Sequence, residues 1–168
     1  MAEHTSLHRR SIRLQDYDYA KQGAYFVTIC TKHRESFFEN TFIRKIAQDC
    51  WMNIPAHFHS VELDEWIVMP NHLHGILLLA DTEINQQRNP ANYFSKISPS
   101  SKTLAVVIRT YKAAVTTACR QAMEKEFAWQ RNYFERIIRN EAELNRIRQY
   151  IISNPENWEN DAENPKYA

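Results

Sequence analysis

A chain of 168 residues with 43% hydrophobic and 24% charged residues is typical of a globular protein with one sizeable core. Its net charge of +1 excludes a strongly basic molecule, although residues 102–150 hold ten Lys/Arg against five Asp/Glu. Two glycines exclude glycine-rich phosphate loops, and three separated cysteines exclude a disulfide framework. Because the sequence shows neither an apolar run of ~20 residues nor a signal-peptide pattern, we expect a cytoplasmic protein without membrane association.

Hydrophobic periodicity predicts seven elements of secondary structure. Alternating apolar residues predict strands, whereas apolar residues recurring three or four apart predict helices. The chain is expected to run through an irregular lead-in over residues 1–22, a strand over 24–32, a helix over 41–54, strands over 57–69 and 72–80, a polar loop over 81–101, a helix over 102–125, a strand over 129–139 and a helix from Asn140 to Pro155. The order β-α-β-β-α-β-α predicts an α+β fold, an antiparallel sheet with helices packed mainly on one face. We expect one domain over residues 23–158 and an acidic tail over 159–168.

Two histidines interrupt an otherwise apolar strand in the segment WIVMPNHLHGILLL, residues 66–79. Because residues two apart on a strand share a face, His72 and His74 are expected side by side, with Leu73 turned away. This geometry allows both imidazoles to bind one metal ion, which would need a third protein ligand. It is also the geometry of two ordinary surface or hydrogen-bonded histidines, and spacing alone leaves both interpretations open.

The last predicted helix carries a second polar pair. Tyr150 and Asn154 are four residues apart and project from one helical face. Asn154 precedes Pro155, which disfavours the α region, so Asn154 is expected to mark the helix end. Taken singly, Asn154 could be only a cap and Tyr150 only a core or interface aromatic. Of the other tyrosines, Tyr111 lies on an apolar helical stripe and is expected in the core, and Tyr133 could face either side of the sheet.

Three segments, VMPNHLHGI, WQRNYFERIIRNEAEL and RIRQYIISNP, together resemble the single-tyrosine HUH transposases (the IS200-like transposase domain), and most closely the REP-associated tyrosine transposases. The resemblance extends over residues 20–158 and implies the ferredoxin/RRM-like HUH fold. It implies that His72 and His74 bind Mg²⁺ or Mn²⁺, that Tyr150 is the nucleophile, and that Asn154 completes the metal shell. Many insertion-sequence members carry Gln at the last position, and Asn matches the REP-associated branch.

The reaction implied by this resemblance is cleavage of hairpin-bearing single-stranded DNA by the phenol oxygen, giving a 5′-phosphotyrosine and a free 3′-OH that can later rejoin strands. An unperturbed phenol, with a pKa of about 10, is a weak nucleophile at neutral pH, so a metal that polarises the phosphate is expected. The covalent intermediate conserves the phosphodiester energy, so no nucleotide cofactor is expected. The resemblance favours a monomer over a homodimer.

Basic and aromatic side chains are candidates for holding the DNA. Exposed aromatics in the polar loop, Tyr93 and Phe94, could stack on unpaired bases. Arginines in the lead-in and around the tyrosine helix could contact phosphates. These arginines are Arg9, Arg10, Arg13, Arg131, Arg136, Arg139, Arg146 and Arg148.

Two other functions stay open from the sequence. A non-catalytic module that binds nucleic-acid hairpins would need neither a metal nor a nucleophile. A metal-dependent hydrolase would use water in place of Tyr150. A covalent protein–DNA adduct that requires Tyr150 is expected only for the tyrosine transposase.

Overall fold

The computed structural model describes residues 23–80, 103–124, 126–161 and 164. The predicted lead-in with Arg9, Arg10 and Arg13, the predicted loop with Tyr93 and Phe94, and most of the acidic tail lie outside these residues. Among the helices that are described, none combines the length and the apolar character needed to cross a bilayer.

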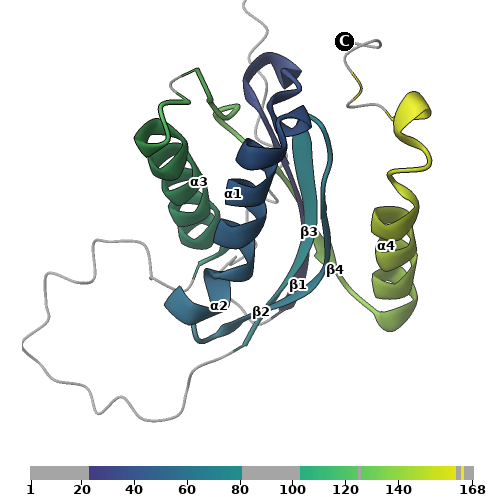
Figure 1. The fold of residues 1–168 in the computed structure, drawn as a ribbon. Helices are drawn as coiled ribbons and strands as arrows, with labels where there is room; N and C mark the ends of the chain where they lie inside the picture. The colour runs from purple at the N-terminus through teal and green to yellow at the C-terminus, as the bar shows by residue number, and fades with distance from the viewer. Residues whose placement is uncertain (1–22, 81–102, 125, 162–163, 165–168) are drawn as a thin grey trace, which may run out of the picture.

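A four-stranded antiparallel sheet with strand order β2-β3-β1-β4 forms the centre of the fold (Figure 1). The strands are β1 (Gly23–Cys30), β2 (Val61–Val68), β3 (His72–Leu79) and β4 (Phe134–Ile138). The α-helices are α1 (Thr41–Met52), α2 (Ile54–His57), α3 (Leu104–Gln121) and α4 (Glu141–Ser153), and the 3-10 turns are η1 (Lys32–Arg34), η2 (Phe37–Glu39) and η4 (Trp158–Asn160). Figure 1 shows α1, α2 and α3 on one face of the sheet and α4 on the other. The predicted α+β fold is confirmed.

Element boundaries differ from the prediction around Pro55. The helix expected over residues 41–54 ends at Met52, and Pro55 lies in the first turn of the separate helix α2. Proline fits a first helical turn, because its fixed φ suits a helix and its missing N–H has no intrahelical acceptor there. β2 consequently starts at Val61 rather than at residue 57.

Alternation along the central strands divides the core into two layers. On the α1/α3 face, Val27 and Leu73 belong to the larger buried cluster. On the α4 face, Phe26 and Ile76 pack with Ile151 of α4. Because side chains two apart share a face, the even-numbered β3 residues before Ile76, which are the two histidines, face α4.

A β-bulge in β2 brings an acidic side chain to α4. Leu63 pairs with Leu77 and Trp66 pairs with Gly75, so β2 has one extra residue between these two pairs. Asp64 lies in this bulge and accepts hydrogen bonds from Arg148 of α4, from Nε at 2.8 Å and from Nη2 at 2.5 Å. This two-point ion pair fixes α4 to the edge strand of the sheet.

Gly75, directly after the second histidine, lies against the indole of Trp51. A Cβ added at Gly75 would lie 2.4 Å from Cζ2 of Trp51, whereas a Cβ at Gly23 would be 3.5 Å from the nearest atom of Tyr25. Trp51 is fully buried and packs edge-on against Tyr111 with ring centroids 5.1 Å apart, so the indole has little room to move. Glycine is therefore required at position 75 by close packing of β3 on α1.

We expect Gly75→Ala to lower the free energy of unfolding by about 1–3 kcal/mol, because the added methyl group overpacks the core. The matched variant Gly23→Ala should change it by less than about 0.5 kcal/mol. Urea denaturation of both variants measures the difference, and equal stabilities would contradict the close approach of Trp51.

The hydrogen bond from Arg148 lowers the pKa of the Asp64 carboxyl. Because the pKa is lower in the folded state, the ion pair stabilises the fold at pH values above about 3.9, the pKa of Asp in the unfolded chain. This stabilisation is lost as the pH falls through the pKa of Asp64 in the folded protein. We therefore expect Asp64→Asn to be less stable than wild type at pH 7, and the gap to close below about pH 4.

Chemical denaturation across this pH range checks the prediction. The control is Asp49→Asn, because the Lys45–Asp49 pair has side chains 71% and 52% exposed and should add little at any pH. A gap of the same size at pH 3 and pH 7 would show that Asp64 does not act through its charge.

Candidate active site

The two histidines open β3 directly under α4. His72 is fully buried and His74 is 2% exposed. Their Nε2 atoms are 3.0 Å apart. The structure therefore has the shared-face geometry expected from the HLH spacing, and it buries both rings rather than leaving them at the surface.

The side chain of Asn71 sets the protonation pattern of His72. Asn71 Nδ2 donates to the carbonyl of Arg34 at 3.1 Å, which leaves Oδ1 facing His72 Nδ1 at 2.8 Å. Nδ1 of His72 must then carry the hydrogen, and Nε2 presents a lone pair to His74. Arg34 has a left-handed φ of 58°, a strained conformation for this residue type.

His74 is held in a similar way from the neighbouring strand. Its Nδ1 lies 2.8 Å from Oγ1 of Thr28 on β1, the residue that pairs with it across the sheet. The phenol oxygen of Tyr150 lies 3.2 Å from Nε2. If the phenol donates this bond, Nδ1 carries the hydrogen, and the lone pair on Nε2 points towards His72 and the phenol.

Both imidazoles are neutral at pH 7. Burial, together with the neighbouring His74 and Arg34, lowers the pKa of His72 to about 2. Burial lowers the pKa of His74 to about 4, against an opposing effect of the Asp161 carboxylate. Neutral imidazole is the form that binds a metal ion.

A carboxylate completes the group of converging side chains. A ligand atom each from His72, His74 and Asp161 lie within 4.8 Å of one another, and Asp161 is 8% exposed. Ligands about 2.1 Å from an ion and at right angles to each other are about 3.0 Å apart. This matches the separation of the two Nε2 atoms, so the histidine pair is spaced to bind one divalent cation, and the Asp161 carboxylate lies close to that pair.

Helix α4 places Tyr150 over His74. The ring centroids of Tyr150 and His74 are 5.2 Å apart, and the Tyr150 ring is edge-on to Phe26 at 6.1 Å. Tyr150 is 45% exposed, so part of its side chain is accessible to solvent. Besides Arg148, the contacts that fix α4 are the Asn140 cap on Glu143, the Arg136–Glu143 ion pair and the burial of Ile147 and Ile151.

Asn154 follows the last residue of α4, as predicted. The following proline predicted that Asn154 would leave the α region, but Asn154 stays in it. Its φ is −59° and its ψ is −40°, and its carbonyl accepts from the backbone N–H of Asn157 at 3.1 Å, which continues the turn. Its side-chain Nδ2 donates to Oδ2 of Asp161 at 2.9 Å. Its Oδ1 is buried without a hydrogen-bond partner among the described residues.

The candidate phosphate-binding arginines fall into two groups. Arg148 and Arg136 are engaged in ion pairs with Asp64 and Glu143. Arg131, Arg139 and Arg146 are exposed and make no side-chain ion pair within the described part of the chain, whereas the Arg136 side chain is 58% exposed despite its ion pair. The second group is the one placed to meet a ligand from solvent.

The two alternative tyrosines lie elsewhere. Tyr111 is 2% exposed and donates to the carbonyl of Ala47 at 3.2 Å, in the core as predicted. Tyr133 is partly buried and packs against the larger core cluster, the one under α1 and α3. Tyr150 is thus the tyrosine that the described structure brings to the histidines.

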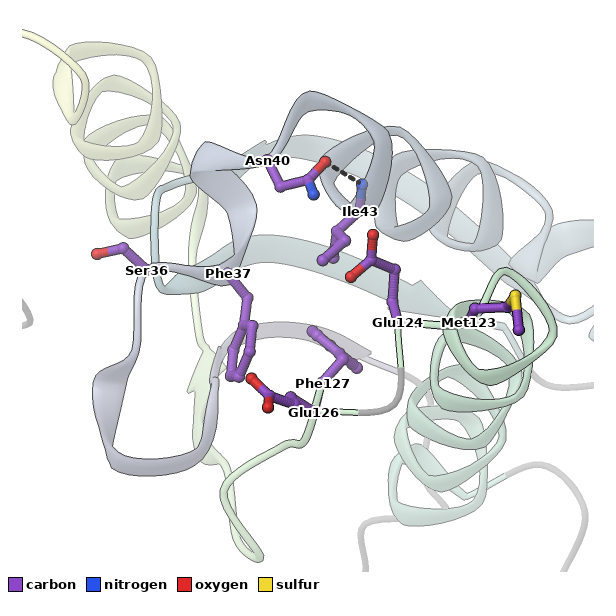
Figure 2. A pocket seen from close by; sticks show the side chains of 8 residues that line it. All are labelled: Ser36, Phe37, Asn40, Ile43, Met123, Glu124, Glu126 and Phe127. Carbon is purple, nitrogen blue, oxygen red and sulfur yellow. Dashed lines mark hydrogen bonds between the residues drawn. The ribbon is translucent and has the colours of Figure 1, made fainter.

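A pocket of about 500 Å³ lies away from this group, where η2 and the start of α1 meet the segment that follows α3 (Figure 2). Its charged lining residues are Glu124 and Glu126. A negative lining repels the phosphate backbone of a nucleic acid. This pocket is therefore a poor place for DNA.

Sequence reasoning missed Asn71, Thr28 and Asp161. The position of Asn71 beside the HLH motif was a usable signal, because histidine ligands generally bond a second polar group. Thr28 required the register between β1 and β3. Asp161 lies in the stretch predicted as an acidic tail, and only the turn after α4 brings it back to the histidines.

Comparisons with known proteins show the family of this chain. The family model described as "Transposase IS200 like" matches residues 19–154. An uncharacterized protein of Haemophilus influenzae is 39% identical in an alignment of 165 positions that covers 92% of this chain and 92% of that protein.

Two solved structures match this chain, and the first of them shares its fold. A REP-associated tyrosine transposase bound to a REP hairpin aligns with a TM-score of 0.63 at 21% identity, over 88% of this chain and 74% of that one. A putative transposase from Deinococcus radiodurans R1 aligns with a TM-score of 0.35 at 18% identity, over 84% of this chain and 95% of that one. With a family model matched over most of its length, the chain belongs to the IS200-like transposase family.

Proposed function

We propose that this protein is a metal-dependent transposase-type nuclease that cleaves hairpin-bearing single-stranded DNA with Tyr150 as the nucleophile. The observation that supports it most directly is the 3.2 Å approach of the Tyr150 phenol to His74, from a residue 76 positions further along the same chain. The similar structure solved with a REP hairpin supports a hairpin as the DNA partner. Because one chain supplies both groups, the geometry suits a monomer.

In the proposed reaction, the Tyr150 oxygen attacks a backbone phosphorus. The bond from phosphorus to the 3′ oxygen breaks, the phenol proton leaves to water on the exposed side of the ring, and the 3′ oxygen takes up a proton. The products are a 5′-phosphotyrosine and a 3′-OH, and attack by a 3′-OH on the phosphotyrosine reverses the step. Phe26 keeps the ring oriented throughout, since the two rings are in edge-on contact.

His72 and His74 would hold Mg²⁺ or Mn²⁺, which polarises the scissile phosphate and stabilises its developing charge. Asn154 is the further ligand that the family resemblance implies. Its Oδ1 has no hydrogen-bond partner in the part of the chain that the structure describes, which is compatible with a place near the ion. The exposed Arg131, Arg139 and Arg146 would contact phosphates along the DNA.

A covalent adduct tests the proposal. We expect the protein with Mn²⁺ or Mg²⁺ to form a denaturation-resistant complex with a pool of 3′-labelled single-stranded hairpin oligonucleotides of randomised flanking sequence. The label must be at the 3′ end, because the fragment joined to the tyrosine lies 3′ of the break. Tyr150→Phe should reduce the adduct by more than about 10³-fold, because only the reacting oxygen is removed while the ring packing is kept.

Matched variants separate this proposal from its rivals. Tyr133→Phe should form the adduct as wild type does, whereas the double variant His72→Ala/His74→Ala should not. Cleavage that persists in Tyr150→Phe would indicate a hydrolase that uses water. Metal-independent binding with no adduct from any oligonucleotide of the pool would indicate a hairpin-binding module.

The hydrogen bond from His72 to Asn71 gives a further prediction. Asn71→Ala should weaken Mn²⁺ binding by about 10–100-fold, because His72 loses the acceptor that keeps its Nε2 free of hydrogen. Asn71→Asp keeps an acceptor oxygen and should recover part of the affinity. Isothermal titration with Mn²⁺ measures all three proteins, with the exposed Asn53→Ala as the control. Unchanged affinity in Asn71→Ala would contradict this role.

A further inference from the structure

A cation between His72 and His74 needs at least one more protein ligand, and two side chains compete for that place. Asn154 lies at the end of α4, and Asp161 lies seven residues further on, after η4. The two are hydrogen-bonded, with Asn154 Nδ2 donating to Asp161 Oδ2 at 2.9 Å. This bond assigns them different roles, because an amide that donates to a carboxylate oxygen orients that carboxylate.

Charge favours Asp161 as the ligand. Both imidazoles and the Asn154 amide are neutral, so without Asp161 this ligand set would offer a doubly charged ion no opposite charge. Charged groups buried in proteins are generally paired or bound to metals, and Mg²⁺ and Mn²⁺ are hard ions that take carboxylate oxygens readily. Asp161, 8% exposed beside the two ring nitrogens, supplies one negative charge at the place where the cation would be.

The chain after α4 is built to return Asp161 to the histidines. The Trp158 ring packs against the His72 ring with centroids 5.9 Å apart. The backbone N–H of Asp161 donates to the Trp158 carbonyl at 3.2 Å, and Nδ2 of Asn164 donates to the same carbonyl at 2.9 Å. Asp161 is therefore placed by a hydrogen-bonded turn anchored on a histidine.

We propose that Asp161 is the third protein ligand of the cation and that Asn154 is the residue that positions it. Asn154 holds Oδ2 of Asp161 through Nδ2, and its buried Oδ1 is left to accept from the hydration shell of the ion. The catalytic use of the ion rests on the proposed function, but its binding does not.

Mn²⁺ titration of the full chain without DNA, by calorimetry and by electron paramagnetic resonance, tests this proposal. Asn has almost the same shape as Asp but no charge. Loss of a residue that only hydrogen-bonds a metal ligand weakens metal binding by roughly 10–100-fold, and Asp161→Asn should weaken Mn²⁺ binding by more than that. Asn154→Ala should weaken Mn²⁺ binding by an amount within that roughly 10–100-fold range. Glu156→Gln, an exposed acid of the same turn, should bind Mn²⁺ as wild type does.

A ligand exchange keeps the test independent of folding effects. Asp161→Cys should acquire tight Cd²⁺ binding with a thiolate-to-metal absorption band that wild type lacks, because thiolates prefer soft ions. The melting temperature of each variant without metal reports on the fold alone.

Three results would overturn the proposal. They are wild-type Mn²⁺ affinity in Asp161→Asn, abolished affinity in Asn154→Ala with little change in Asp161→Asn, or an Asp161→Cys protein without the Cd²⁺ band. If the metal results hold and wild type forms no DNA adduct, the proposed function fails and Asp161 remains a ligand. If the adduct forms and Asp161→Asn binds Mn²⁺ as tightly as wild type, the proposed function holds and Asp161 is not a ligand.

Discussion

Two neutral imidazole nitrogens held 3.0 Å apart in a buried site are the arrangement on which the rest of the site depends. Lone pairs at that distance repel each other unless a cation or a shared proton lies between them. The surrounding residues maintain the approach: Asn71 and Thr28 bind the outer nitrogens, and the sheet fixes both backbones. Burial keeps both rings neutral, since it lowers the pKa of each.

The site also requires that helix α4, which carries Tyr150, is held in a fixed position on the sheet. Figure 1 shows α4 on the opposite face of the sheet from the other α-helices. Its apolar residues Ile147 and Ile151 pack there in the smaller of the two core clusters. An ion pair fixes the orientation of α4 on the sheet, because Arg148 donates two hydrogen bonds to Asp64 in the β-bulge. The extra residue in β2 therefore helps to determine where the Tyr150 phenol lies, although β2 contributes nothing to the candidate site itself.

Local periodicity predicted the elements, because alternation and helical spacing are properties of neighbouring residues. The shared face of His72 and His74 followed from the same rule. The meeting of Tyr150 with His74 came from family resemblance, since spacing says nothing of contacts between residues 76 positions apart. Asp161 escaped prediction because its place depends on a turn that keeps Asn154 helical despite the proline after it. The ion pair of Arg148 could not be predicted for a similar reason: its partner Asp64 lies 84 residues away.

The separation of the phenol from the imidazoles along the chain has a consequence for biosynthesis. A ribosome completes β3 some 70 residues before it reaches the tyrosine on α4, so a growing polypeptide has the imidazole pair without the attacking oxygen. Under the proposed function, DNA near the site of translation is safe from an unfinished copy. In that proposal, strand breakage would begin only when the last helix docks.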